Sequence, residues 1–528
     1  MFKMKKARLL ASLSVLLLAV QVMYSQDDPV VKKIIELGRN DNQTMQHLDI
    51  LSNRIGGRPI GSDAYDNAVE WTASMFRKWG LEVWVQECGE LPVGFNRGPW
   101  FGKMLGGNGM SLHFATPSYS VGTKGVQRGH VLMEPRTQAE FNKMKGALKG
   151  AWVLIGGDSN GYPIEWNGES DSHRKEVIER NNAVKKQNDE IAAYNKSMRN
   201  KYGRDEGEKR AKPFLPYEYE PGMFYRQMVE AGILGIIQAA DVPIRALYDK
   251  QNLHKMAFDN LPPVPDIKLD RDQYEVIEDM VKKREYFLLE FDIRNHFKMG
   301  PVKCHSVIGV IRGTEFPDEY VMAGGHLDSY DVATGGVDCG NGVSAVMEAA
   351  RLVSQAGGKP KRSILFCLWA GEEFGFVGSK YFVNNKVVPM EKISNYINRD
   401  SGPLVPTGVT VPEAMYKDFS SVCAPLENAH PDFKFKVRKR KQPEVPPSVA
   451  VGSDYVYFKM NGVPAIGFNL SDPKGYNFLY SEVWHTERDT YDKAIAEYQE
   501  HAATCTAVVL YGLANLDHLL SREGLYKK

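Results

Sequence analysis

The sequence predicts an α/β protein that contains a stretch of different, β-rich character. Residues Arg362–Ala370 form an almost continuous apolar run, which is typical of a strand covered on both faces of its sheet. Asn341–Ala356, just before it, has apolar residues at helical spacing. Between about residues 121 and 295, short apolar strands are set among loops instead. We therefore expect an α/β region on the C-terminal side of a separate β-rich region.

Length and composition narrow the class of protein. At ~150 residues per domain, 528 residues correspond to about three units. The 66 basic residues nearly balance the 65 acidic ones, and this argues against a nucleic-acid-binding protein, which usually has a basic excess. Six cysteines are too few for a disulfide scaffold in a chain of this length. They form no CxxC pair, so a thiolate zinc site has little support.

The N-terminus has the order of an export signal. Lys3 and Arg8 belong to a basic start, residues 9–22 are apolar, and small Ser25 precedes polar residues. The apolar run is short for a membrane span, which needs ~20 residues. We expect residues 1–25 to be a signal peptide, and the protein to be periplasmic or secreted without stable membrane insertion afterwards. An uncleaved N-terminal anchor is the alternative.

The remaining elements follow along the chain. Apolar residues at spacings of three and four predict a helix that ends at Gly80, with a strand over residues 81–86. Residues 170–212 mix acids and bases, which favours a solvated pair of helices. In the C-terminal region we expect further strands over residues 306–312, 319–323, 393–397 and 465–470, and a closing helix over 496–520.

Candidate metal ligands follow several of these strands. His326 and Asp328 are two residues apart, so in extended chain they lie on one side, where a carboxylate can fix the tautomer of an imidazole. Asp338 lies among glycines at the entrance of a helix, where it is either a metal ligand or an ordinary N-cap. Glu372 and Glu373 follow the apolar strand, at the sheet edge where ligands bind in α/β folds.

Two more candidates complete the set. Asp400 follows the strand over residues 393–397, and His485 lies in a polar loop near the C-terminus. Two histidines and several carboxylates suit zinc or a similar divalent ion. Five ligands exceed the need of one catalytic zinc, and with one bridging carboxylate they fill a two-metal site. In the Glu372–Glu373 pair, one Glu can bind metal while the other acts as general base.

These motifs resemble those of the co-catalytic di-zinc exopeptidases, a family of aminopeptidases and carboxypeptidase Q-like enzymes. The matching segments are GRPIGS (57–62), HLDS (326–329), WAGEE (369–373), GSD (452–454) and HTERDT (485–490). The resemblance implies a three-layer α/β/α zinc-peptidase fold with a mixed central sheet. It also implies a catalytic domain in two parts, residues 26–125 and 293–528, with a protease-associated-like domain inserted at 126–292.

The resemblance further implies a role for each candidate. His326 and Asp400 would bind one zinc, Glu373 and His485 the other, and Asp338 would bridge the two. Glu372 would be the general base, and Asp328 would orient His326. The chain departs from the family pattern at two positions. Cys339 follows the bridging Asp where an acid or amide is common, and Arg399 precedes Asp400 where a smaller or apolar residue is usual.

The predicted function is that of an exported zinc-dependent exopeptidase. It would hydrolyse a terminal peptide bond of short peptides or dipeptides, using water activated by two metals and a glutamate base. The sequence leaves open an aminopeptidase, a carboxypeptidase or a dipeptidase, and also the oligomeric state. A tyrosine such as Tyr455 is a candidate for stabilising the oxyanion. The alternatives are a catalytically inactive peptide-binding protein on the same fold and a glutaminyl-cyclase-like aminoacyl transferase.

Overall fold

The computed structural model describes residues 28–249 and 252–527. The predicted signal peptide, residues 1–25, lies outside this part. Among the described residues, no helix combines the length and apolar character that a membrane crossing requires.

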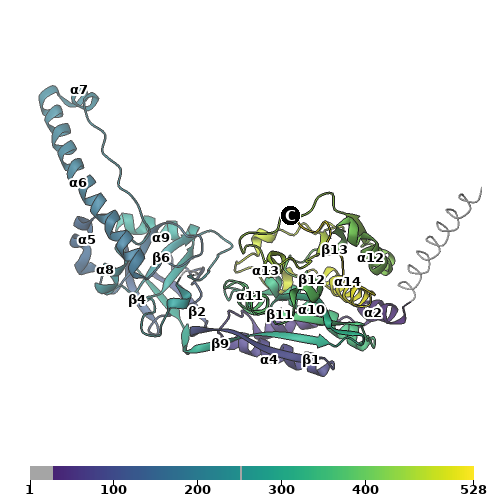
Figure 1. Cartoon of the computed structure of the whole chain (residues 1–528). Coiled ribbons are helices and arrows are strands. Elements are labelled where there is room, and N and C mark those ends of the chain that lie inside the picture. Colours follow the sequence, from purple (N-terminus) through teal and green to yellow (C-terminus); the bar gives the residue numbers. More distant parts are fainter. Residues whose placement is uncertain (1–27, 250–251, 528) are drawn as a thin grey trace, which may run out of the picture. The chain divides into compact units, whose positions relative to one another are not determined.

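The chain forms two units, each with its own sheet (Figure 1). Unit 1 comprises residues 28–94 and 299–527, and unit 2 is Phe95–Lys298. Unit 2 thus begins earlier than the predicted boundary at residue 126. The reason is strand pairing, because β2 (Trp100–Gly106) is hydrogen-bonded along its whole length to β8 (Phe287–Ile293).

The central sheet of unit 1 is mixed, as predicted. Its five strands lie in the order β1-β9-β11-β10-β12. Strand β10 is parallel to β11 and β12, whereas β9 is antiparallel to β11. The strands are β1 (Glu82–Asn96), β9 (His296–Ile311), β10 (Phe316–His326), β11 (Arg362–Trp369) and β12 (Ile393–Asn398). A smaller sheet of β14 (Lys436–Lys439), β13 (Val405–Val411) and β15 (Phe468–Ser471) accompanies it.

Helices cover both faces of this sheet. Leu365 and Trp369 of β11 share a buried cluster with Phe382 and Phe458 from two helices on one face. Side chains alternate along a strand, so the intervening residues face the opposite side, and the helices α10 and α14 contact β10 and β11. The helices of unit 1 are α2 (Pro29–Asn40), α3 (Thr44–Asp49), α4 (Asp63–Lys78), α10 (Gly342–Gln355), α11 (Val377–Asn384), α12 (Glu413–Cys423), α13 (Tyr455–Met460) and α14 (Ala496–Ala514).

Local sequence explains where these helices begin and end. The hydroxyl of Ser62 accepts a hydrogen bond from the backbone N–H of Tyr65 and so caps α4. Helix α14 ends at Ala514, six residues before the predicted end. There the side-chain amide of Asn515 donates to the carbonyl of Tyr511 and accepts from the backbone N–H of Lys361, which ties the chain down outside the helix.

Unit 2 is built on a seven-stranded sheet. Its order is β2-β8-β4-β5-β6-β7-β3, and Trp152 of β5 lies fully buried in its core. The other strands are β3 (Phe114–Ala115), β4 (Gln127–Met133), β5 (Ala151–Asp158), β6 (Gly235–Ala240) and β7 (Asp266–Asp270), and the helices are α5 (Gln138–Met144), α6 (Gly168–Tyr202), α7 (Arg204–Lys209), α8 (Tyr225–Glu230) and α9 (Arg271–Lys283).

The predicted helical pair over residues 170–212 is present as one long and one short helix, and the chain returns from it as an extended segment. The structure has the 35-residue helix α6, short α7, and an extended return segment that lies along α6 (Figure 1). Asn181, Asn188 and Asn195 of α6 each donate to one backbone carbonyl and accept from the N–H of the same residue, Glu218, Leu215 and Lys212 respectively. Seven helical residues rise about 10.5 Å and three extended residues span about 10 Å, so the two spacings match.

Candidate metal centre

The parallel strands bring most of the predicted ligands to one edge of the sheet. His326 is the last residue of β10 and pairs with Trp369, the last residue of β11. Glu372 and Glu373 follow β11, and Asp400 follows β12. Since the carboxyl ends of parallel strands meet at one edge, these side chains converge there as the sequence predicted.

Asp338 reaches the same edge of the sheet from a segment that precedes a helix, whereas the residues above follow strands. It lies in the segment before α10, with non-helical backbone angles. The residue at the N-cap of α10 is Asn341, so the alternative interpretation of Asp338 as an N-cap is wrong. The buried carboxylate of Asp338 is thereby free to face the ends of the strands.

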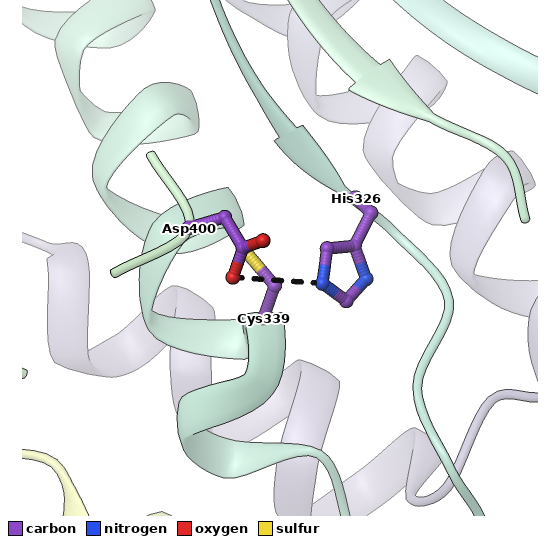
Figure 2. A group of neighbouring side chains, drawn as sticks. All are labelled: His326, Cys339 and Asp400. Atoms are coloured by element: carbon purple, nitrogen blue, oxygen red, sulfur yellow. Dashed lines mark ion pairs between the residues drawn. The ribbon is translucent and has the colours of Figure 1, made fainter. Parts of the chain in front are cut away.

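The carboxylate of Asp338 lies between the two histidines. Its Oδ1 is 3.1 Å from Nε2 of His326, and its Oδ2 is 3.5 Å from Nε2 of His485. A second carboxylate lies near the same Nε2 atom of each histidine. Glu373 Oε2 is 3.0 Å from His485 Nε2, and Asp400 Oδ1 is 3.7 Å from His326 Nε2, a pair drawn in Figure 2. The structure thus assembles all five predicted ligands.

The donor set and its electrostatics fit divalent cations. Burial, and next the charge of Asp338, raise the pKa of Glu373 well above its usual range. Burial also raises the pKa of Glu372, against the opposing charge of His326. The Oδ2 atom of Asp338 is buried and accepts no hydrogen bond. Packed carboxyl groups of this kind repel one another unless a cation balances them, and imidazole and carboxylate donors suit zinc.

The tautomer of His326 is fixed by the backbone of Asp328. Nδ1 of His326 lies 2.9 Å from the carbonyl oxygen of Asp328, and since a carbonyl only accepts, Nδ1 carries the proton. In the neutral ring, Nε2 is therefore the nitrogen that can bind a metal. The carboxylate of Asp328, predicted to make this contact, lies farther away, with Oδ1 at 3.6 Å from Nδ1.

The Asp328 carboxylate instead holds the glutamate pair. Its two oxygens accept hydrogen bonds from the backbone N–H groups of Glu372, at 3.1 Å, and Glu373, at 3.2 Å. Asp328 thus positions three residues of the centre, one through its carbonyl and two through its carboxylate. Sequence spacing suggested a role for Asp328 but not this partner, which comes from another strand.

Two further charged residues hold the backbone of the centre, and sequence reasoning assigned them no role. Asp489 accepts from the backbone N–H of Val337 at 2.6 Å and of Asp338 at 3.3 Å. Fully buried Arg58 donates to the carbonyl of Leu327 at 2.9 Å. Arg58 also donates to the carbonyls of Leu51, Gly56, Thr334 and Gly335. Arg58 lies in GRPIGS and Asp489 in HTERDT, two segments that match the family motifs. This location was the one feature of the sequence that could have indicated a role for them.

Two tyrosines lie within electrostatic reach of the centre. The side chain of Tyr480 is 37% exposed, but desolvation of its hydroxyl and then the charge of Asp338 raise its pKa, so the hydroxyl stays protonated and can donate a hydrogen bond. Burial, followed by the charge of Asp400, also raises the pKa of Tyr455, the candidate from the sequence. The nearby charges identify Tyr480 as a second candidate that sequence spacing did not single out.

Comparison with known proteins supports the resemblance. Residues 306–510 match the sequence model of peptidase family M28. Rat carboxypeptidase Q is 28% identical over 323 residues, which cover 58% of this chain and 63% of that protein. The match thus spans less than two thirds of that relative. Carboxypeptidase Q of Xenopus laevis is 22% identical over 93% of this chain and 91% of its own length.

Solved structures share the fold. A peptidase M28 precursor from Shewanella amazonensis has a TM-score of 0.56 at 18% identity, covering 93% of this chain and 97% of its own. A zinc aminopeptidase from Bacillus subtilis has a TM-score of 0.50 at 14% identity, covering 92% and 97%. The expected α/β zinc-peptidase fold is thereby confirmed. Through residues 306–510, and with the matching motifs and the assembled ligand set, the chain is thus similar to peptidase family M28.

Proposed function

We propose that this protein is an exported zinc-dependent exopeptidase that hydrolyses a terminal peptide bond of short peptides or dipeptides. The observation that carries the proposal is the position of Asp338, whose two carboxylate oxygens face different histidines, each next to a further carboxylate. This arrangement supports two metal sites that share one bridging ligand. The basic N-terminus and apolar run of the sequence support export.

The residues divide into two ligand groups around Asp338. His326 and Asp400 would hold one zinc, and Glu373 and His485 the other. Zinc bound there supplies a Lewis acid that polarises a substrate carbonyl and lowers the pKa of water. The hydrogen bond from Nδ1 of His326 to the carbonyl of Asp328 turns Nε2 toward the other ligands, and Nε2 is the atom that would bind the metal in the neutral ring.

Glu372 is the residue placed to move protons. It belongs to neither ligand pair, and it is less buried than Glu373. Burial raises the pKa of Glu372 above the usual range of a carboxyl group, and a stronger base of this kind suits proton transfer. In the reaction its carboxylate takes a proton from the attacking water, whose oxygen bonds to the carbonyl carbon. The carbon–nitrogen bond then breaks, and Glu372 passes the proton to the leaving amine.

Tyr480 is proposed to stabilise the negative charge that develops on the carbonyl oxygen. Its hydroxyl remains a donor because partial desolvation and the charges of Asp338 and Asp400 oppose ionisation. Donors aimed at a developing oxyanion are among the strongest contributions to catalysis. Tyr455 is the other candidate, and the two hydroxyls are separable by mutation.

One experiment tests the function directly. Purified protein is loaded with zinc, its metal content is measured, and it is assayed on unblocked, N-blocked and C-blocked dipeptides. We expect about two ions per chain, hydrolysis that chelators abolish, and loss of hydrolysis when one of the two termini is blocked. The blocked terminus that abolishes cleavage tells whether the enzyme recognises a free amino or a free carboxyl group.

Two outcomes would contradict the proposal. A protein that takes up no more than one ion after zinc loading has no two-metal centre. A protein that holds two ions yet cleaves no member of the panel is a binding protein or catalyses another reaction.

A further inference from the structure

Cys339 places a sulfur atom inside the metal centre. The absence of CxxC pairs argued against a thiolate zinc site, and the sequence shows Cys339 only as a departure from the family pattern. In the structure, one ligand atom each of His326, Cys339 and Asp400 all lie within 4.8 Å of one another (Figure 2). Cys339 is fully buried, as is His326.

The surrounding backbone holds this sulfur closely. A Cβ atom added to Gly342 would lie 2.6 Å from Sγ of Cys339, and one added to Gly325 would lie 3.2 Å from it. On the same side the thiol donates a hydrogen bond to the carbonyl of Arg399 at 3.1 Å. Glycines therefore make the space that the sulfur fills, and its position is set by packing.

The distances are close to those of a shared ion. Zinc bonds are about 2.3 Å to sulfur and about 2.0–2.1 Å to nitrogen, so in a tetrahedral site the two ligand atoms lie about 3.6 Å apart. The three ligand atoms lie within 4.8 Å of one another, so they need to move together by at most about 1.2 Å to share one ion. The buried guanidinium of Arg399 lies close enough for its positive charge to interact with Cys339 and Asp400, and it offsets part of the negative charge gathered there.

We infer that Cys339 is a ligand of the metal held by His326 and Asp400, which makes that site a nitrogen, oxygen and sulfur site. The inference rests on the metal centre of the proposed function. On binding, the S–H bond breaks, the thiolate electron pair binds the metal, and the proton leaves to solvent. A soft sulfur ligand favours zinc and cadmium over manganese and magnesium at this position.

A purely structural role for Cys339 makes different predictions. In that role the thiol serves only as a donor to the carbonyl of Arg399. The variant Cys339→Ser keeps a donor of similar size but removes the sulfur. It therefore preserves the structural contact and changes only the ligand.

The test is cobalt substitution of the full protein, followed by its near-ultraviolet spectrum. A thiolate bound to Co²⁺ gives an intense sulfur-to-metal charge-transfer band, which oxygen and nitrogen ligands do not give. We expect this band in the wild type and its loss in Cys339→Ser, with cobalt content remaining near two ions per chain. The matched control is Cys423→Ser, a buried cysteine of α12 outside the group, which should keep the band.

Several outcomes separate this inference from the proposed function. Wild type that binds two cobalt ions without the band overturns the inference and leaves the proposed function standing. A band that survives Cys339→Ser also overturns it, because another sulfur is then the ligand. Protein that binds no cobalt defeats both. If Cys339→Ser does not fold, ¹¹³Cd NMR of the cadmium-loaded wild type decides, since one sulfur ligand shifts one of its two resonances strongly downfield.

Discussion

His326 and His485 face opposite oxygens of a single carboxylate, that of Asp338. His326 ends strand β10, whereas His485 lies in a loop with a positive φ of 59°, a conformation that few non-glycine residues adopt. The ring of His485 packs 4.5 Å from the ring of Tyr330. The surrounding structure therefore imposes the position of His485, and backbone strain of this kind is common at functional sites.

The adjacent glutamates are predicted to separate proton transfer from metal binding. Glu372→Gln should keep two metals while turnover falls by about 10²–10⁴-fold, because the amide cannot act as a base. Glu373→Gln should instead lose metal, since Glu373 lies 3.0 Å from His485 and an amide is a poorer ligand. Metal content and kcat, measured on both variants, check the assignment. If Glu372→Gln lost metal and Glu373→Gln kept it, Glu373 would be the base and Glu372 the metal ligand.

Asp489 is predicted to support metal binding without touching a metal. Asp489→Ala should weaken zinc affinity by about 10–100-fold, because it frees the backbone N–H groups that hold Val337 and Asp338. Asp489→Asn keeps one acceptor oxygen, so its zinc affinity should lie between those of the wild type and Asp489→Ala. Competition with a chromogenic chelator measures the affinity. Asp492→Ala, three residues away and paired with Thr490, is the control. Unchanged affinity in Asp489→Ala would limit Asp489 to a structural role.

Tyr480 is predicted to act on kcat alone. Tyr480→Phe should retain both metals and lower kcat by about 10²–10³-fold with little change in KM, as expected for a lost oxyanion donor. Tyr476→Phe removes an exposed hydroxyl that binds Glu497 and should behave like wild type. Steady-state kinetics on the best dipeptide substrate provides the comparison. If Tyr455→Phe shows the loss and Tyr480→Phe does not, Tyr455 is the donor.

The parts of the fold and site that the sequence predicted depend on patterns within short stretches of the chain. The apolar run of β11 and the helical spacing of α10 fix those elements, and the ligands that follow strand ends converge because parallel strands share an edge. The boundary of unit 2 was missed because it depends on the pairing of β2 with β8, which are far apart in the sequence.

The supporting contacts were not predictable for the same reason. Nothing around Asp489 or Arg58 in the sequence shows which backbone groups they bind, since their partners lie more than 100 residues away in several cases. Likewise, a mixed run of charges does not show that the second helix is short and that an extended segment follows it. The seven-residue spacing of Asn181, Asn188 and Asn195 reflects their pairing with an extended segment. This is recognisable only once the structure shows which backbone groups they bind.

The asparagine contacts along α6 predict a local effect on the return segment. Asn188→Ala removes two hydrogen bonds to Leu215, worth about 1 kcal/mol each. Backbone amides of residues 212–218 should then exchange with solvent about tenfold faster or more, while the core of unit 2 is unaffected. Hydrogen exchange read by mass spectrometry checks this. Asn182→Ala, the exposed neighbour, is the control. Equal exchange in both variants would show that the asparagine contacts do not hold the segment.

Glu134 predicts a pH dependence of stability in unit 2. It is buried, and it accepts hydrogen bonds from the hydroxyl of Tyr219 and from the backbone N–H groups of Gly156 and Gly222. Burial outweighs these contacts and raises the pKa of Glu134 from 4.5 to about 7. Between these two values the folded state keeps a proton that the unfolded state has released. The free energy of unfolding therefore falls as pH rises through this window, by up to about 3 kcal/mol.

The measurement is denaturant unfolding at about pH 5 and about pH 8, with hydrogen exchange of β5 amides as the probe specific to unit 2. Wild type should lose stability at the higher pH. Glu134→Gln cannot ionise, so the part of the loss that comes from this residue should disappear and the two pH values should give closer free energies. Glu179→Gln removes an exposed carboxylate of α6 and should keep the wild-type dependence. The substitution removes only the titration of Glu134. Therefore, if Glu134→Gln keeps the full wild-type dependence of unfolding free energy on pH, another group causes that dependence.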